Sequence, residues 1–331
     1  MTTPTRLEDA YGRIATKLRI SVTDRCDLRC TYCMPAEGLE WLPKAEILSF
    51  EEIRTLTEVA VACGVRKVRL TGGEPLVRRG IVELVRMLSE VKGLDDLAMT
   101  TNGTRLGEFA EPLRAAGLDR LNVSLDTLDP TRFHEMTRRD GLERVLASLD
   151  VAARVFPGRL KINAVALRGV SETELPGFLE LARRHDLIIR FIEFMPLDAD
   201  GAWQREQVLS GAELLALARE HAELEAEPCS GPSSPAVEYR LAGGRGGIGF
   251  INSVTEPFCG SCDRIRLTAD GKIRTCLFSI RETDLMPVIR AGDRDAIARL
   301  LTHAVAFKEA GHRINDPDFE PASRSMSQIG G

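Results

Sequence analysis

The sequence has no long hydrophobic run and no excess of positive charge. None of its 331 residues lies in an apolar stretch near eighteen residues long, so we expect no membrane-spanning helix. The first ten residues, MTTPTRLEDA, lack the apolar segment of a secretory signal, and we therefore expect a cytoplasmic protein with no membrane partner. The formal net charge of −5 argues against a nucleic-acid partner, so an anionic small ligand would need a local cluster of arginines.

Histidine is also scarce, and disulfide bonds are not expected. Only five histidines occur, the first of them at position 134. Because the cytosol keeps thiols reduced, the eight cysteines of a protein without an export signal indicate metal ligands or free thiols. Their spacing must therefore identify the kind of site.

Short β-type runs alternate with longer amphipathic helical runs between about residues 17 and 192, a pattern typical of βα units around a parallel sheet. The predicted strands are Lys17–Val22, Lys67–Leu70, Leu97–Thr100, Arg120–Leu125, Lys161–Ala166 and Ile188–Ile192. Six units are too few for a closed eight-stranded barrel. We therefore expect an α/β fold in which residues 1–195 form an open, partial TIM-type barrel.

The pattern changes after Met195, and residues 196–331 are expected to form a smaller module that closes the open side of the barrel. A Pro/Ser/Gly-rich stretch at 228–236 is predicted to be a loop, and the last two dozen residues show no helical or strand periodicity. The other predicted elements are helices at Ala212–Glu220, Asp284–Ala291 and Asp295–Phe307, and strands at Val237–Leu241, Gly247–Ile251 and Arg264–Leu267.

Cys26, Cys30 and Cys33 form a C-x3-C-x2-C group directly after the first predicted strand. Three thiolates can hold three irons of a [4Fe–4S] cluster and leave the fourth iron open. An amino acid such as methionine could chelate that iron through its amine and carboxylate, and the cluster could then pass an electron to a bound sulfonium. Zinc is the alternative, but it prefers four closed ligands, and no fourth Cys or His lies nearby in the sequence.

Cys259, Cys262 and Cys276 form a second group of three, spaced C-x2-C-x13-C. A structural zinc ion would again need a fourth ligand, so a second cluster with an open iron is the favoured interpretation. Arg264 and Arg266 follow two residues apart on a predicted strand, so their side chains share one face. Guanidinium groups bind phosphate oxygens, which indicates a phosphate-bearing ligand beside this cluster, although a solvated charged face is the plainer alternative.

Polar residues also follow several predicted strands. TGGEP at 71–75 could be an ordinary turn, but its glycines would let a ligand approach the backbone. Thr100, Ser124 and Met195 end or follow other strands, where helix caps would be the plainer explanation. Because the carboxyl ends of parallel strands meet at one mouth of a barrel, we expect these residues to lie together.

The first cysteine group, with Tyr32 before its third cysteine, resembles the radical S-adenosylmethionine (SAM) superfamily. With the second group, the chain from Leu18 to Gly331 resembles the GTP 3′,8-cyclase family of molybdenum-cofactor biosynthesis. The motifs that carry this resemblance are LRISVTDRCDLRCTYCMP, VRLTGGEPLVRR, TTNG, LNVSLD, RFIEFMP, FC-x2-C-x-R-x-RL and the terminal Gly330–Gly331.

The resemblance implies two [4Fe–4S] clusters, one on each cysteine group, with the open iron of the second anchoring guanine. SAM would contact Tyr32, Gly73, Ser124 and Met195. GTP would contact Arg19, Arg69, Thr100, Lys161, Arg264, Ile265 and Arg266, and the catalytic residues would be Arg264, Arg266, Gly330 and Gly331.

The implied reaction begins when an electron from the first cluster cleaves SAM to methionine and a 5′-deoxyadenosyl radical. That radical takes hydrogen from C3′ of the GTP ribose, and the resulting carbon radical attacks C8 of guanine. An electron and a proton then complete (8S)-3′,8-cyclo-7,8-dihydroguanosine 5′-triphosphate. The implied partners are GTP, a low-potential electron donor, the next enzyme of the molybdopterin pathway and a second subunit in a homodimer. The alternatives are a radical SAM peptide-modifying enzyme with an auxiliary cluster, and a non-catalytic iron–sulfur or zinc protein.

Overall fold

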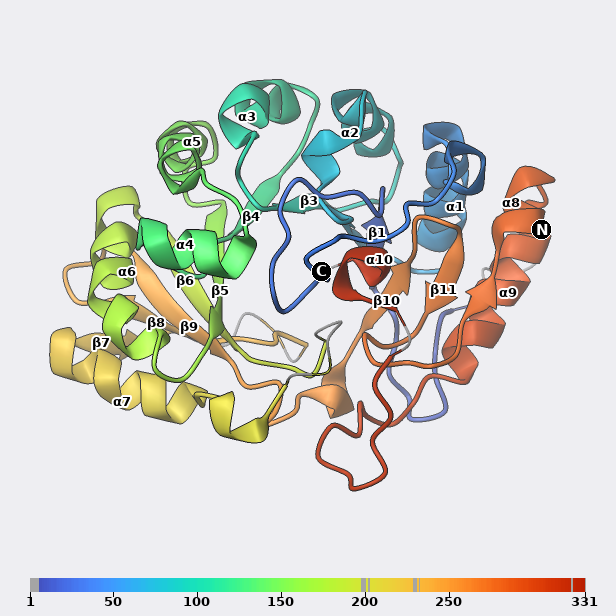
Figure 1. The fold of residues 1–331 in the computed structure, drawn as a ribbon. Helices are drawn as coiled ribbons and strands as arrows, with labels where there is room; N and C mark the ends of the chain where they lie inside the picture. Colours follow the sequence, from blue (N-terminus) through green and yellow to red (C-terminus); the bar gives the residue numbers. More distant parts are fainter. Residues whose placement is uncertain are drawn as a thin grey trace.

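A computed structural model describes residues 6–197, 201, 203–228, 231, 233–322 and 324–330. Its strands form one twelve-stranded sheet in the order β12-β11-β10-β1-β2-β3-β4-β5-β6-β9-β8-β7 (Figure 1). The strands are β1 (Lys17–Ser21), β2 (Lys67–Thr71), β3 (Asp96–Thr101), β4 (Arg120–Ser124), β5 (Leu160–Ala166), β6 (Ile188–Glu193), β7 (Leu224–Ala226), β8 (Val237–Leu241), β9 (Gly247–Ile251), β10 (Arg264–Leu267), β11 (Lys272–Arg274) and β12 (Thr283–Asp284).

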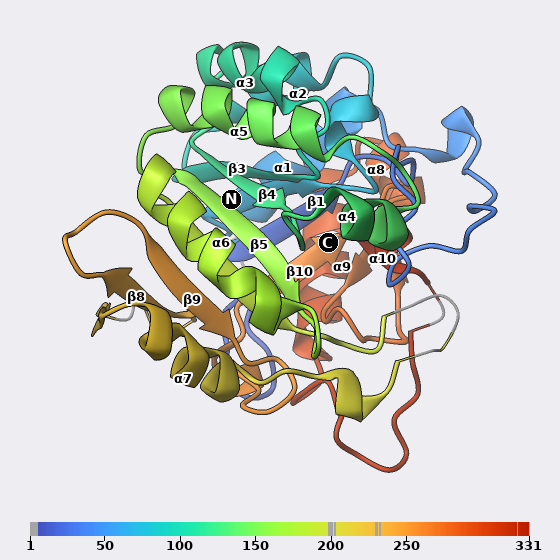
Figure 2. The ribbon, with the colours of Figure 1, turned by 60° about the vertical axis from the view of Figure 1, so that its left-hand side comes forward.

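Most helices follow the strands and surround the curved sheet on its outside, whereas the short C-terminal helix lies within its arc (Figures 1 and 2). They are α1 (Phe50–Ala62), α2 (Ile81–Ser89), α3 (Leu106–Ala115), α4 (Pro130–Thr137), α5 (Leu142–Val155), α6 (Ser171–His185), α7 (Gly211–His221), α8 (Met286–Arg290), α9 (Arg294–Ala306) and α10 (Met326–Ile329). No helix among the described residues is long and apolar enough to cross a membrane.

The open, partial barrel predicted from the sequence is confirmed. Strands β1 to β6 are parallel neighbours, and each begins and ends within two residues of its predicted position. The later strands extend this sheet at both edges, because β10 pairs parallel to β1 and β9 pairs parallel to β6. Both halves of the sequence therefore contribute to one curved surface.

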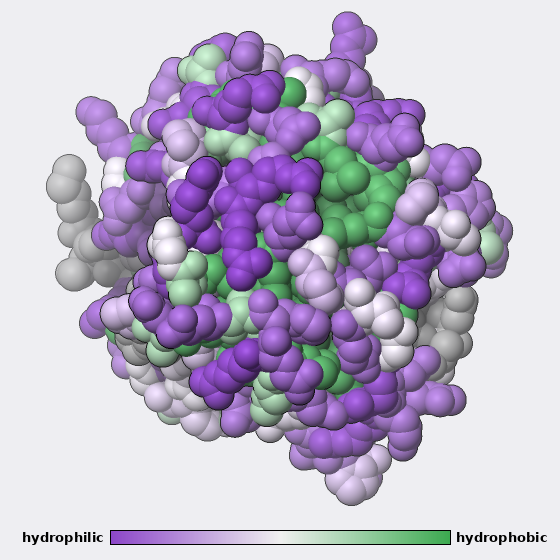
Figure 3. Space-filling view, turned by 90° about the vertical axis from the view of Figure 1, so that its left-hand side faces the viewer, coloured by the Kyte–Doolittle hydropathy of each residue, from purple (hydrophilic) through white to green (hydrophobic). Residues whose placement is uncertain are grey.

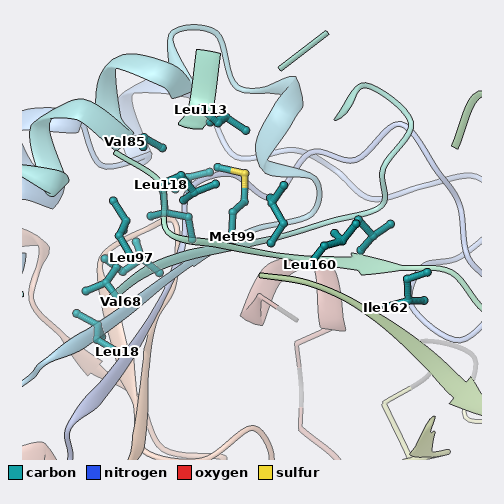
Figure 4. Close-up of a cluster of buried hydrophobic side chains, with 14 of the residues drawn as sticks. Leu18, Val68, Val85, Leu97, Met99, Leu113, Leu118, Leu160 and Ile162 are labelled. Atoms are coloured by element: carbon teal, nitrogen blue, oxygen red, sulfur yellow. The ribbon is translucent and has the colours of Figure 1, made fainter. Parts of the chain in front are cut away.

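Alternation along the strands divides the sheet into an apolar outer face and a polar inner face. Leu18, Val68 and Met99 occupy outer positions, are 1% exposed or less, and pack beneath the helices (Figure 4). Leu113 on α3 and Val85 on α2 meet them from the helix side. The face of the molecule in Figure 3 is mostly hydrophilic, with apolar residues gathered in its upper middle. Most charged residues on the strands therefore lie on the inner face.

A local hydrogen-bond motif starts α1. Ser49 Oγ accepts a hydrogen bond from the Glu52 amide at 3.2 Å, and the Glu52 carboxylate accepts one from the Ser49 amide at 2.6 Å. This reciprocal capping box fixes the first turn of α1.

Several short elements were not predicted. Helix α4 begins at Pro130 after the cap Asp129, and the two- or three-residue strands β7, β11 and β12 are too short to show alternation. The last two dozen residues, which show no periodicity in the sequence, nevertheless contain α10, and Ser325 and Gln328 form a capping box at its start. The predicted helix 284–291 begins later, at Met286, because residues 283–284 pair with β11.

Candidate active site

The two cysteine groups lie at opposite ends of the inner face. Cys26, Cys30 and Cys33 follow the carboxyl end of β1, whereas Cys259 and Cys262 precede the amino end of its parallel neighbour β10. Cys276 follows the antiparallel strand β11 and so returns to the same end as Cys262. The Thr16 amide donates to the carbonyl of Asp263, next to Cys262 of the second group. From residue 16 to residue 22, near the first group, the extended chain covers about 20 Å.

The TGGEP segment holds the loop of the first cysteine group in place. The Gly73 amide donates to the Thr23 carbonyl at 2.7 Å, and the Glu74 amide donates to the Arg25 carbonyl at 2.8 Å. A Cβ atom at Gly73 would lie 2.4 Å from the Arg25 oxygen, so only glycine permits this approach. TGGEP is therefore a brace for the cysteine loop and not an ordinary turn.

Two carboxylates, Asp27 and Asp126, lie close to the first cysteine group. Asp27 accepts hydrogen bonds from Asn102 Nδ2 at 2.7 Å and from Thr104 Oγ1 at 2.6 Å, and its Oδ1 lies 3.9 Å from Cys26 Sγ. Asp126 accepts from the Tyr32 hydroxyl and, at 2.8 Å, from the Val165 amide. The Asp126 side chain thus fixes the aromatic ring that precedes Cys33.

Glu74 is the most deeply buried carboxylate at this end, being 1% exposed. It accepts hydrogen bonds from Thr101 Oγ1 at 2.7 Å and from the Asn102 amide at 2.6 Å. Burial nevertheless raises the pKa of Glu74 to about 7. A cationic group beside Glu74 would offset the free-energy cost of burying its carboxylate.

Three arginines lie side by side across the inner face. In the sheet register Arg19 on β1 is paired with Arg266 on β10 and with Arg69 on β2. Burial and the neighbouring positive charges lower the pKa of Arg69 to about 9, lower that of Arg266 to about 10, and lower that of Arg19 well below its ordinary value. Because guanidinium groups stay protonated in proteins, this arginine row is a strained cluster of charge that an anion would stabilise.

A second cationic pair continues this face and shares one carboxylate. Lys161 Nζ lies 2.9 and 3.1 Å from the two carboxylate oxygens of Glu238, and Arg190 Nε donates to the same carboxylate at 2.6 Å. Arg190 was not identified from the sequence, although its place inside RFIEFMP, alternating with apolar residues, was an available signal. Thr100, which was identified, accepts from Arg69 Nη1 at 3.1 Å.

Cations surround the second cysteine group. Lys308 Nζ donates to the carbonyls of Cys262 and Arg264 at 2.9 and 2.7 Å and lies 3.5 Å from Cys262 Sγ. Arg13 Nη1 donates to the Cys259 carbonyl at 2.8 Å. Although burial acts against it, the charges of Lys308 and Arg264 hold the pKa of Cys262 below its ordinary value. Neither Lys308 nor Arg13 was identified from the sequence.

The C-terminal tail reaches the first cysteine group. Arg324 anchors it through two contacts with Asp270 at 3.0 and 2.8 Å, and α10 then lies within the arc of the sheet (Figure 1). Arg266 Nη1 donates to the carbonyl of Gly330, and the Ser327 backbone approaches the Cys33 sulfur. Gly331 lies outside the described residues. The described tail is thus an ordered part of the site and not a frayed end.

The remaining predicted residues take different positions. Ser124 ends β4, and Met195 follows β6, so both lie at the same end of the sheet as Cys26. Ile265 points the other way, because it alternates with the two arginines and is fully buried in the outer core. Only its backbone is available to the inner face.

The chemistry of both groups suits iron–sulfur clusters. The six cysteines of the two groups are free thiols. Within the described part of the chain, no three Cys, His, Asp or Glu side chains converge tightly enough to hold a single metal ion. A cluster instead spreads its thiolate ligands over separate irons, so three sulfurs on each loop fit it.

Comparisons with known proteins agree with these features. The sequence profile of the radical SAM superfamily matches residues 20–182, and the profile described as Molybdenum Cofactor Synthesis C matches residues 187–314. The crystal structure of Streptococcus suis SuiB bound to S-adenosylmethionine has a TM-score of 0.62 and 15% identity, over 86% of this chain and 66% of that one. At that identity the likeness supports the fold alone.

Full-length relatives identify the family. The GTP 3′,8-cyclase of Rhodopirellula baltica is 49% identical over 336 residues, which cover 100% of this chain and 94% of that protein. The GTP 3′,8-cyclase of Streptomyces coelicolor is 47% identical over 328 residues, which cover 98% and 96% respectively. With its cysteine groups at the two ends of a partial barrel, this chain belongs to the GTP 3′,8-cyclase family of the radical SAM superfamily.

Proposed function

We propose that this chain is a GTP 3′,8-cyclase that uses SAM and two [4Fe–4S] clusters to form (8S)-3′,8-cyclo-7,8-dihydroguanosine 5′-triphosphate for molybdenum-cofactor biosynthesis. The observation that carries the proposal is the arginine row Arg266–Arg19–Arg69, which lies between two cysteine groups on the inner face of the barrel. Because the protein is acidic overall, a cluster of buried arginines at this place favours the binding of a polyanion such as a triphosphate.

SAM is assigned to the end of Cys26, Cys30 and Cys33. Gly73, Tyr32, Ser124 and Met195 would contact it, and the Glu74 carboxylate lies on the same brace. A SAM ammonium near Glu74 would supply the cation that this buried carboxylate lacks. When bound, the first cluster and SAM supply a 5′-deoxyadenosyl radical that can take hydrogen from C3′ of the ribose.

GTP is assigned to the space between the two cysteine groups. The triphosphate would bind the arginine row together with Arg264 and Lys161, and Thr100 would contact the same ligand beside Arg69. The second cluster on Cys259, Cys262 and Cys276 would anchor the guanine. The tail, through Gly330, would cover the mouth and keep water from the reacting atoms.

The other expectations follow from the resemblance and stay predictions. A low-potential electron donor must reduce the clusters, and the product would pass to the next enzyme of the molybdopterin pathway. A homodimer and a cytoplasmic location are likewise predicted. The peptide-modifying and non-catalytic alternatives are set aside, because relatives over the whole length of the chain are GTP 3′,8-cyclases.

The experiment is anaerobic reconstitution followed by incubation with SAM, dithionite and GTP. The chain should bind about eight irons and release both 5′-deoxyadenosine and a cyclised nucleotide. Cys276→Ala should retain about four irons and the first cluster yet form no cyclised nucleotide. Product formation by Cys276→Ala, or about four irons in the unmodified chain, would contradict the assigned second cluster.

A further inference from the structure

Lys308 is a buried ammonium that contacts the second cysteine group. Its side chain belongs to a residue only 5% exposed, just beyond the end of α9. Two of its protons are used by the carbonyls of Cys262 and Arg264, and the third points to Cys262 Sγ at 3.5 Å. The ammonium is therefore held against a sulfur that is assigned as a cluster ligand.

Across the described residues, no ion pair joins Lys308 to a carboxylate. The adjacent Glu309 is turned away, because its carboxylate accepts from Thr275 Oγ1 at 2.7 Å and from Ser279 Oγ at 2.5 Å. A buried cation is costly unless an anion compensates it. The Cys262 sulfur, 3.5 Å away, becomes such an anion once it is a thiolate.

The first cysteine group differs in the charge beside a sulfur. There a carboxylate oxygen, Asp27 Oδ1, lies 3.9 Å from Cys26 Sγ, Asp126 holds the Tyr32 ring beside Cys33, and the cation Arg29 donates to the Cys26 carbonyl at 2.7 Å. A negative neighbour disfavours added negative charge, whereas a positive neighbour favours it. The two groups therefore differ in the charge next to a ligand sulfur, which is a carboxylate at Cys26 and an ammonium at Cys262.

We propose that Lys308 tunes the second cluster, raising its reduction potential and helping to retain it through the Cys262 thiolate. This inference rests on the proposed second cluster. One-electron reduction adds one negative charge to a cluster, so an ammonium 3.5 Å from a ligand sulfur stabilises the reduced form more than the oxidised form. Lys308 is a positioning residue that acts through Cys262, and it takes no part in bonding to substrate.

The test compares Lys308→Met, which keeps the length of the side chain without its charge, with Lys308→Arg, which keeps the charge. Each reconstituted holoenzyme is titrated potentiometrically, with the two clusters followed by electron paramagnetic resonance and iron counted per chain. The signal of the second cluster is the one that survives when Cys26, Cys30 and Cys33 are changed to Ala. Lys92→Met, which removes an exposed charge in the loop between α2 and β3, is the matched control.

Lys308→Met should lower the potential of the second cluster and leave that of the first unchanged, while Lys308→Arg and Lys92→Met keep both near the unmodified values. Loss of the second cluster from Lys308→Met alone, with the first retained, also supports the proposal. The proposal would be overturned if Lys308→Met kept about eight irons and unchanged potentials. Equal shifts in the potentials of both clusters would also overturn it, as would loss of the second cluster from both Lys308 variants. About four irons in the unmodified chain would instead contradict the assignment of a second cluster.

Discussion

Gly330 packs so closely against Thr71 that a Cβ atom added at Gly330 would lie 2.5 Å from Thr71 Oγ1. Gly330 also has a positive φ of 89°, and its carbonyl accepts from Arg266. The tail therefore packs against β2 in this way only when position 330 carries no side chain.

Gly330→Ala should displace the tail and lower the rate of GTP cyclisation by about a hundredfold, since small misplacements at an active site cost that much. Iron content should stay unchanged. The matched control is Gly243→Ala, which has a similar φ of 90° but no atom within 4 Å of the added Cβ. Equal rates in the two variants would show that backbone strain, and not the contact with Thr71, explains any loss.

Gly73→Ala should disrupt the loop of the first cysteine group, because its Cβ would lie 2.4 Å from the Arg25 carbonyl oxygen. We expect about four irons in place of about eight after reconstitution, with no 5′-deoxyadenosine formed. Gly158→Ala, in a turn with no atom within 4 Å of the new Cβ, should keep the full iron content. A Gly73→Ala protein with both clusters would contradict the bracing role of TGGEP.

Arg19→Met should weaken GTP binding, because Arg19 lies at the centre of the arginine row. Loss of one charge-assisted contact to phosphate is worth about 2 kcal/mol, or roughly a thirtyfold rise in Kd. Calorimetry should show that SAM binding is unaffected. Arg159→Met, which removes a half-exposed arginine that pairs with Asp119 at 3.8 Å, is the control and should leave GTP binding unchanged.

The raised pKa of Glu74 predicts how the free energy of unfolding depends on pH in the protein before cluster reconstitution. Its pKa is about 7 in the folded chain against an ordinary value of 4.5, so the folded state binds more protons between these values. The free energy of unfolding should therefore fall as pH rises from about 4.5 to 7, by about 3 kcal/mol from this group, and then level off. Glu74→Gln should lose that part of the slope in denaturant titrations. Parallel curves for the two proteins would contradict the raised pKa.

The sequence predicted the parts of this site that local patterns encode. Alternation of residue types located β1 to β6 and placed Arg264 and Arg266 on one face, and cysteine spacing located both groups. These features depend on a few neighbouring residues, whose spacing follows directly from the geometry of strands and loops.

Residues that meet only in three dimensions were missed. Lys308 lies 46 positions from Cys262, and Arg190 lies 48 positions from Glu238, so no local pattern connects the members of either pair. Helix α10 was missed because four residues are too few to show a 3.6-residue period. Its capping box, Ser325 with Gln328, was the one signal available beforehand.

The most direct test of the central claim, that GTP is held between the two cysteine groups with its ribose facing SAM, uses GTP labelled with deuterium at C3′. After one turnover of the reconstituted enzyme with SAM and dithionite, mass spectrometry of 5′-deoxyadenosine reports where its new hydrogen came from. The account predicts deuterium in 5′-deoxyadenosine from the unmodified enzyme, together with a cyclised nucleotide that has lost it. Unlabelled 5′-deoxyadenosine accompanying that product would contradict the account.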